Sequence, residues 1–444
     1  MLTWTWAFHI SEMLIRLVML VYVPQRRSPA AARTWLLLIF MEPILGLVLY
    51  NLFGRAYLPK RRIKIQARVS EFIKKVGPHF FAKLTRPELE PHFQQAVTLA
   101  QNLGDFGIVG GNSVELLTDY DGAINRLVAD IDAATHHVHL LYYIFANDGT
   151  GRRVADALTR AARRGVTCRV LMDGLGSRKG MRALGPELRA AGVEVHEMLP
   201  VGLFRRHGSR YDLRNHRKIA VLDGRVGYAG SQNLVDAFFK KGLTFEEVVV
   251  RVTGPVVQQL QAVFLADHYL ETETTLDLHK LFPEPVETGP SPAQVLPSGP
   301  GYPHANTQRL LVALVHGARE RVVITTPYFV PDEPFLQAMQ TAVLRGVAVH
   351  LVVSKQADQL LVGLAQRSYY EELLGSGVRI HLYHRRFLHA KHVSIDDSVA
   401  LIGSSNIDIR SFALNAEVSL LLYDPQVVAR LREVQEEYFA HSEL

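Results

Sequence analysis

Two stretches of the sequence carry the same polar residues at the same spacing. Residues 215–233 read NHRKIAVLDGRVGYAGSQN and residues 388–406 read LHAKHVSIDDSVALIGSSN, so each follows the pattern His-x-Lys-x4-Asp-x6-Gly-Ser-x-Asn. Such a pattern almost never occurs twice by chance, which indicates a duplicated functional motif. The repeated polar residues are His216, Lys218, Asp223, Ser231 and Asn233 in the first copy, and His389, Lys391, Asp396, Ser404 and Asn406 in the second.

These residue types suit a site that acts on a phosphodiester. One imidazole would attack phosphorus while the other protonates the leaving alkoxide. Two copies are needed because in-line displacement places the attacking and leaving groups on opposite sides of phosphorus. The lysines, the asparagines and the Gly-Ser-x-Asn turns would bind the non-bridging oxygens. We expect no metal and no cofactor, because no carboxylate stands at ligand spacing and the lysines would repel a cation.

The acidic residues divide into two groups. Strand alternation places the histidine and lysine of each motif on one face and the aspartates, Asp223 and Asp396, on the other. We therefore expect structural salt bridges from these aspartates rather than chemistry. Two further carboxylates, Glu247 and Glu417, follow the motifs at similar distances. We expect them to fix the histidine tautomers by binding the second ring nitrogen, the alternative being ordinary surface carboxylates on strands.

The segments around the motifs repeat as well. Residues 138–145 (VHLLYYIF) resemble residues 322–329 (VVITTPYF), each an apolar strand. Residues 155–173 and 336–354 both read as an amphipathic helix, a glycine turn and a strand. Strands that alternate with helices predict an α/β fold, here two domains that form one pseudo-twofold duplicated unit behind an N-terminal membrane helical hairpin.

The expected boundaries follow from composition. We expect the following parts: a membrane-anchoring hairpin at 1–54, a basic helical connector at 55–110, a first domain at 111–282, a Pro-rich linker at 283–293 and a second domain at 294–444. The first half carries an extra basic insertion just before its motif, in which four arginines either hold anionic headgroups or form a solvated loop. These arginines are Arg205, Arg206, Arg210 and Arg214.

The N-terminus contains two apolar segments of bilayer length. Residues 34–53 hold one charge and are expected to cross a membrane as a helix, whereas residues 4–23 either cross it or lie in its interface. Glu12 and Arg16 lie four apart in the first segment, so they share a helix face and could pair. More basic residues follow the second segment than separate the two, which predicts that the large C-terminal part is cytoplasmic. They are Arg26, Arg27 and Arg33 between the segments, and Arg55, Lys60, Arg61, Arg62, Lys64 and Arg68 after them.

The charge balance favours an anionic partner. The formal net charge is +6 and the isoelectric point is near 9.3, which fits nucleic acid or anionic lipid equally. A nuclease has no use for two apolar segments of 20 residues, so we expect no nucleic acid partner. A non-enzymatic scaffold would tolerate loss of histidine or lysine, but both sets are complete.

The motifs resemble those of the phospholipase D superfamily, and within it the bacterial cardiolipin synthase family. Further segments share the resemblance, among them TPYFVPDE, SYYEELLGSGVRI and GSSNIDIRSFALNAEVSLLLYD. The family's catalytic histidines fall on His216 and His389, and its lysines fall on Lys218 and Lys391. The motif aspartates of the family fall on Asp223 and Asp396, and its asparagines on Asn233 and Asn406.

The resemblance implies an enzyme of the bacterial inner membrane with its catalytic domains on the cytoplasmic side. It would transfer a phosphatidyl group from one phosphatidylglycerol to another through a phosphatidyl-histidine intermediate and release glycerol. Phosphatidylglycerol and other anionic phospholipids would be its partners, and a homo-oligomer is possible. The same residues would also serve a phospholipase D-type hydrolase, or a transferase that uses another donor such as phosphatidylethanolamine.

Overall fold

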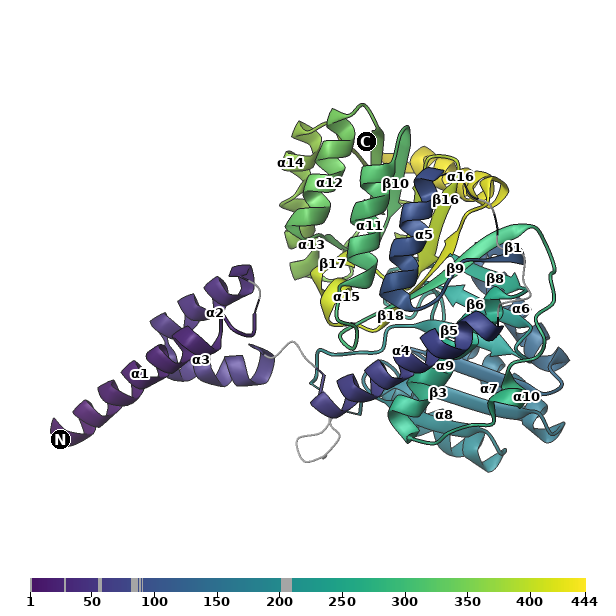
Figure 1. Cartoon of the computed structure of the whole chain (residues 1–444), viewed down its shortest axis with the longest axis horizontal. Helices are drawn as coiled ribbons and strands as arrows, with labels where there is room; N and C mark the ends of the chain where they lie inside the picture. The colour runs from purple at the N-terminus through teal and green to yellow at the C-terminus, as the bar shows by residue number, and fades with distance from the viewer. Residues whose placement is uncertain are drawn as a thin grey trace. The chain divides into compact units, whose positions relative to one another are not determined.

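The chain forms two compact units, Met1–Leu58 and Pro59–Leu444 (Figure 1). The computed structural model describes residues 2–27, 29–54, 58–80, 87, 89, 91–200 and 210–444. The first unit is helical, and the second is built on a mixed β-sheet.

The first unit differs from the expected hairpin of two full-length helices. Helix α1 (Leu2–Tyr22) is continuous, and its segment Trp4–Tyr22 is the one described helix that is long and apolar enough to cross a membrane. The second apolar segment is interrupted at Glu42, so it forms α2 (Pro29–Met41), α3 (Pro43–Leu49) and the π-helical turn η1 (Tyr50–Gly54). The prediction that residues 34–53 form one crossing helix was wrong.

The interruption has a local cause. Proline at position 43 lacks an amide hydrogen and its ring clashes with the preceding turn, so the helix ends before it. The chain then returns onto α2, where a Cβ on Gly46 would lie 2.7 Å from the Cα of Ile39. The expected pair of Glu12 and Arg16 is replaced by other contacts. Arg16 Nε donates to the carbonyl of Phe40 at 3.2 Å, and Glu12 lies 3.7 Å from a ring nitrogen of His9.

The second unit contains a 15-stranded sheet to which the two halves contribute equivalent strands. The first half supplies β1 (Val109–Leu117), β2 (His137–Tyr142), β3 (Thr167–Asp173), β4 (Glu194–Met198), β5 (Lys218–Leu222), β6 (Val226–Gly230) and β8 (Val249–Thr253). The second half supplies β9 (Ser291–Ser298), β10 (Arg321–Thr325), β12 (Ala348–Ser354), β13 (Arg379–Tyr383), β15 (His392–Ile395), β16 (Val399–Gly403), β18 (Glu417–Leu422) and β19 (Ser442–Glu443).

The strand order shows the duplication. It runs β1-β8-β6-β5-β2-β3-β4 in the first half and β9-β18-β16-β15-β10-β12-β13-β19 in the second. In each half the three strands that alternate with helices are parallel (β2, β3 and β4; β10, β12 and β13), and the motif strands β5 and β15 are antiparallel to them. The prediction of a duplicated α/β unit is confirmed.

Strand β9 begins at Ser291, inside the expected Pro-rich linker at 283–293, so only the end of that linker belongs to the sheet. It pairs with β18 along its length and with β1 at Ser291 and Ala293, so it joins the halves into one sheet. Prolines normally disfavour a central strand because they lack an amide hydrogen. Pro297 is tolerated because it lies beyond the residues that pair with β1. The proline content suggested a linker because amino-acid composition does not show which residues of a strand donate backbone hydrogen bonds to a neighbouring strand.

Helices cover the sheet and fill three cores. Helices α6 (Tyr120–Ala133), α7 (Gly149–Arg163) and α8 (Arg178–Ala190) pack on the first half, and α11 (Asn306–Gly317), α12 (Glu333–Leu344) and α14 (Tyr370–Gly375) on the second. Helices α9 (Val256–Thr272) and α16 (Pro425–Ala440) share a core with strands of both halves. The expected connector contains α4 (Lys60–Phe80) and α5 (Pro91–Gly104), and α5 lies beside α11 in the second-half core (Figure 1).

Candidate active site

Each motif lies where a motif strand meets the end of a parallel strand. Lys218 opens β5 and pairs with Tyr142 at the end of β2. In the second half, β15 opens one residue after Lys391, and His392 pairs with Thr325 at the end of β10. The carboxyl ends of parallel strands are where open α/β sheets bind ligands.

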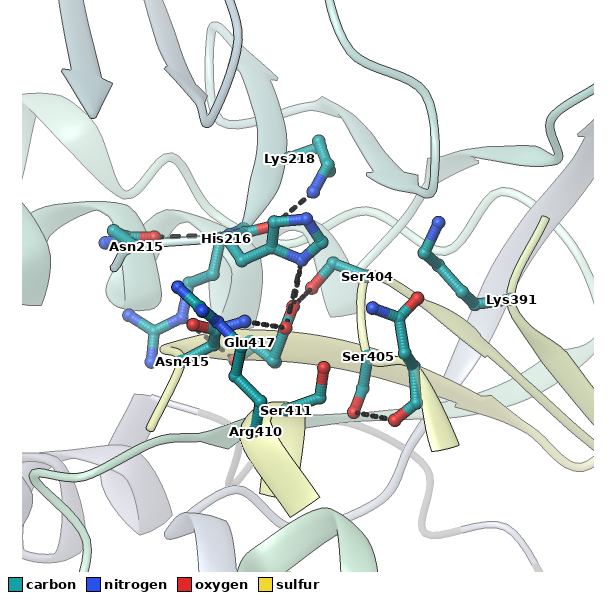
Figure 2. A network of polar contacts seen from close by, with 12 residues as sticks. Asn215, His216, Lys218, Lys391, Ser404, Ser405, Arg410, Ser411, Asn415 and Glu417 are labelled. Carbon is teal, nitrogen blue, oxygen red and sulfur yellow. Dashed lines mark hydrogen bonds and ion pairs between the residues drawn. The ribbon is translucent and has the colours of Figure 1, made fainter. Parts of the chain in front are cut away.

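His216 is held by a carboxylate from the other half of the chain (Figure 2). Its Nδ1 lies 2.9 and 3.0 Å from the two carboxylate oxygens of Glu417, which opens β18. The backbone repeats the link, because the His216 amide donates to the carbonyl of Ala416 at 2.8 Å and the Ala416 amide donates to the carbonyl of Arg214 at 2.9 Å. Side-chain and backbone hydrogen bonds therefore both hold His216 next to Glu417.

The second histidine mirrors this arrangement. His389 Nδ1 lies 2.6 Å from Oε1 of Glu247 in the first half, and its amide donates to the carbonyl of Glu246 at 2.8 Å. The short strands β7 (Phe245–Glu246) and β14 (Phe387–Leu388) pair in parallel beside it. Each carboxylate follows one motif in sequence but binds the histidine of the other, a crossing that sequence distance did not reveal.

The crossed pairs set the protonation of both rings. Burial lowers the pKa of His216 below its ordinary value and that of His389 to about 4, against the opposing effect of each carboxylate. Burial acts to raise the pKa of Glu247 and Glu417, but the facing histidines and the lysines outweigh it, so both carboxylates remain ionised. A neutral imidazole that donates from Nδ1 leaves its Nε2 lone pair free.

The two lysines are buried and face the same site. Lys218 donates to the carbonyl of His216 at 2.5 Å, and Lys391 donates to the carbonyl of His389. Figure 2 shows the Lys218 ammonium group beside the His216 ring and that of Lys391 farther from it. Burial lowers the pKa of Lys218 to about 7 and that of Lys391 to about 8. A bound phosphate anion would favour the charged form of each.

The motif serines face the protein instead of an open site, which differs from the expectation that they bind phosphate. The Ser231 hydroxyl donates to the carbonyl of Val248 at 3.1 Å and accepts from its amide at 3.0 Å. The Ser404 hydroxyl accepts from the amide of Val418 and donates to Glu417 at 2.5 Å. Both serines are fully buried, and each binds the segment that carries an orienting carboxylate.

The motif asparagines are also buried, but they keep donors available. Asn233 accepts a hydrogen bond from the amide of Ile144 at 3.1 Å through its side-chain oxygen, which leaves its amide hydrogens to donate. The side-chain oxygen of Asn406 has no partner among the residues that the structure describes. Each asparagine side chain carries two amide N–H donors, which suits a phosphate oxygen.

The motif aspartates lie off the site, but they bind backbone amides rather than a cation. Asp223 accepts hydrogen bonds at 2.8 Å from the amides of Thr135, His136 and His137. Asp396 likewise accepts from the amides of residues 319–321. The expected salt bridges are absent among the described residues, because each carboxylate caps the backbone where a helix turns into β2 or β10. Both aspartates adopt positive φ angles, +54° and +49°.

Comparison with known proteins places this site in a family. The cardiolipin synthase, phospholipase D-like domain model matches residues 127–268 and 311–439, one match for each half. Cardiolipin synthase A of Yersinia pseudotuberculosis serotype O:1b (strain IP 31758) is 37% identical over 97% of this chain and 91% of its own length. The chain belongs to the cardiolipin synthase family. Cardiolipin synthase A of Pectobacterium carotovorum subsp. carotovorum (strain PC1) is similar to the same degree.

Solved structures support the fold of this cardiolipin synthase family member. The phosphatidylserine synthase of Haemophilus influenzae Rd KW20 matches with a TM-score of 0.59 at 17% identity, over 79% of this chain and 91% of that one. The family and the apolar helix α1 together indicate an enzyme associated with a membrane.

The insertion arginines of this family member do not present free charges where the structure describes them. Arg214 is 1% exposed and pairs with Asp173 at 3.4 Å, so it supports the residues before His216 instead of binding a headgroup. Arg210 pairs with Asp212. Arg205 and Arg206 lie outside the described residues.

A further arginine inside the first motif was missed by the sequence interpretation. Arg217 is buried and donates to Asp267 at 2.6 Å, to the carbonyl of Glu417 at 2.9 Å and to the carbonyl of Ser298 at 3.2 Å. It therefore ties the first motif to α9 and to the second half. The equivalent residue of the second motif is Ala390, and this mismatch between otherwise matching motifs was the available signal.

One group of described side chains in this synthase family member lies close enough together to hold a metal ion. The ligand atoms of Glu194, His196 and His268 lie within 4.8 Å of one another, on β4 and α9. Arg169 already pairs with Glu194 at 3.0 Å and supplies a positive charge there. We assign no metal to this group.

Proposed function

We propose that the chain joins two phosphatidylglycerol molecules into cardiolipin and glycerol. The observation that carries this proposal is the crossed pairing of His216 with Glu417 and of His389 with Glu247. It leaves two Nε2 atoms for one phosphodiester, beside two buried lysines that would neutralise its charge. Family membership supports the choice of phospholipid substrates.

In the first half-reaction, we assign the nucleophile to His216. Binding of the phosphodiester anion favours the protonated form of His389. Nε2 of His216 then forms a bond to phosphorus as the bond to the glycerol oxygen breaks, and His389 gives its Nε2 proton to the departing oxygen, a proton that it regains from the acceptor hydroxyl in the second half-reaction. Glu417 stabilises the positive charge that develops on His216. This carboxylate is held by Ser404 at 2.5 Å and by Asn415 at 3.4 Å, which suits the ring that must stay fixed through both half-reactions.

In the second half-reaction, His389 removes the proton from the terminal hydroxyl of another phosphatidylglycerol. The resulting oxygen attacks phosphorus, and the bond to His216 breaks, which gives cardiolipin and the free enzyme. One phosphodiester replaces another, so the reaction needs no nucleotide and no cofactor.

We place the catalytic unit on the cytoplasmic side of the inner membrane. Nine basic residues follow α1 up to position 68. If α1 is the spanning helix, all nine lie on the catalytic side, so the positive-inside rule favours that side even without a second crossing.

Product analysis tests the proposal. The full chain in detergent is incubated with phosphatidylglycerol, and lipids and glycerol are quantified by mass spectrometry. We expect equal amounts of cardiolipin and glycerol. Phosphatidic acid with glycerol would indicate a hydrolase instead. Release of ethanolamine after addition of phosphatidylethanolamine would indicate a second donor.

A further inference from the structure

Exposed apolar side chains gather around the active site. Among the described residues of Pro59–Leu444, seven of the twelve exposed large hydrophobic residues lie on four segments beside the motifs, and we call these seven the rim. The rim consists of Tyr211, Phe238, Phe239, Leu360, Leu361, Leu364 and Ile409. Leu360 and Leu361, which open helix α13 (Leu360–Arg367), are 75% and 79% exposed, and Phe238 is 70% exposed.

Contacts beside His389 join two of these segments. Lys240, next to the rim phenylalanines, forms an ion pair with Asp358, two residues before α13. Tyr328 donates to the same carboxylate at 2.8 Å, and its ring centroid lies 6.5 Å from that of His389. The ring of Phe239 lies 4.6 Å from that of Phe245, which in turn lies 5.4 Å from His389.

A second set of contacts links the rim to the surroundings of His216. Gln366 of α13 accepts from the amide of Phe329 at 3.0 Å, and Phe329 pairs with Ile407, two residues before Ile409. The next residue, Arg410, donates to the carbonyl of Asp212 at 3.3 Å, beside Tyr211. Figure 2 shows Arg410 close to Glu417 and His216. The four segments therefore border both histidines.

We propose that the rim docks the catalytic unit onto the surface of a phospholipid bilayer. Contiguous exposed apolar residues mark interaction surfaces, and exposed aromatic residues with basic neighbours suit an anionic lipid interface. Lys241, Arg367 and Arg410 are exposed beside the rim and supply such neighbours. The occupant is a bilayer because the same chain carries the apolar helix α1. This inference rests on the proposed function, since docking would bring lipid headgroups to the two histidines.

Fluorescence quenching tests the docking directly. Cys168, the one cysteine of the chain, is buried, so cysteines introduced by Leu361→Cys or Leu344→Cys can be labelled selectively. Leu344 serves as the control because it lies away from the active site. It is 85% exposed at the end of α12, next to the start of β12, whereas the motif contacts the opposite end of β12. In phosphatidylglycerol vesicles with a nitroxide-bearing phospholipid, we expect strong quenching at position 361 and little at 344. Equal quenching at both positions, or none at 361, would overturn the proposal.

Kinetics supply a second, independent test. The double variant Leu360→Ser/Leu361→Ser should lose about tenfold or more in cardiolipin formation from vesicles, because less apolar surface enters the interface. Its activity on monomeric short-chain phosphatidylglycerol should stay unchanged, as should both activities of the control Leu344→Ser/Leu374→Ser. Equal losses on both substrates, or none on vesicles, would contradict docking. A wild-type chain that makes no cardiolipin from either substrate would refute the proposed function, while the quenching result would still decide whether the rim meets the bilayer.

Discussion

Glu417 lies in the second half of the chain, yet its carboxylate binds Nδ1 of His216 in the first half at 2.9 Å. The reciprocal pair joins His389 to Glu247. Neither motif is complete without the other half, because each lacks the group that sets the tautomer of its own histidine.

The Glu417→Gln variant tests this dependence. The glutamine keeps the shape but loses the charge that stabilises a positive His216, so we expect kcat to fall by about 10²–10⁴-fold. The control is Glu433→Gln, an exposed carboxylate on α16, which should leave kcat unchanged. Steady-state cardiolipin formation measures both. Retention of wild-type kcat in Glu417→Gln would contradict the orienting role.

The two histidines can be told apart with an activated substrate. His216→Ala and His389→Ala should each lose at least about 10²–10⁴-fold on phosphatidylglycerol. A nitrophenyl phosphodiester has a leaving group that needs no proton, so His389→Ala should still release a burst of nitrophenolate and His216→Ala should not. Labelled lipid trapped at alkaline pH should be found on the peptide that contains His216. Label on the His389 peptide would reverse the assignment.

The Asp223→Asn variant should lose stability rather than chemistry. Its carboxylate accepts three backbone amides, and asparagine retains one side-chain acceptor and tolerates the positive φ angle. We expect the free energy of unfolding to fall by about 1–3 kcal/mol, with kcat within twofold of wild type at a temperature where both are folded. Denaturant unfolding and steady-state assays measure these quantities. A stable variant without activity would show that Asp223 serves the chemistry.

Substrate binding should weaken as the pH rises. The ammonium groups of Lys218 and Lys391 are charged below their pKa values of about 7 and about 8 and lose their protons above them. A phosphodiester stays anionic throughout, so the dissociation constant of short-chain phosphatidylglycerol should increase between pH 6 and 9, by up to about tenfold per pH unit for each lysine. Calorimetry with the inactive His216→Ala variant avoids turnover. The additional change Lys218→Met should remove the part of this dependence that begins near pH 7, and an unchanged profile would exclude Lys218 from phosphate binding.

Arg217 should contribute much more to the free energy of unfolding than its counterpart Ala390. The Arg217→Ala change leaves Asp267 buried without its charged partner, which costs about 3–5 kcal/mol. The double variant Arg217→Met/Asp267→Leu removes both charges and should recover much of that loss. Denaturant unfolding compares the variants. A loss below about 1 kcal/mol in Arg217→Ala would show that the pair does not hold the first motif in place.

The sequence alone determined the duplicated motif, the α/β fold, and the histidines and lysines of the candidate site. These features follow from local patterns: alternating or helical hydrophobic periodicity, glycine turns and fixed spacing within one strand and its turn. Strand alternation correctly predicted that Asp223 and Asp396 lie off the site. It did not predict that their partners are backbone amides.

Only the tertiary structure decided which groups meet. The crossing of Glu247 and Glu417 depends on how two distant segments pair through β7 and β14 and through the bridge from Asn215 to Ala416. The Ser404 hydroxyl donates to the carboxylate of Glu417, and Arg214 pairs with Asp173, both in the interior of the protein. Spacing along the chain indicates which residues share a helix or strand. Contacts between different helices and strands depend on how they pack, and that packing depends on the whole sheet rather than on any one segment.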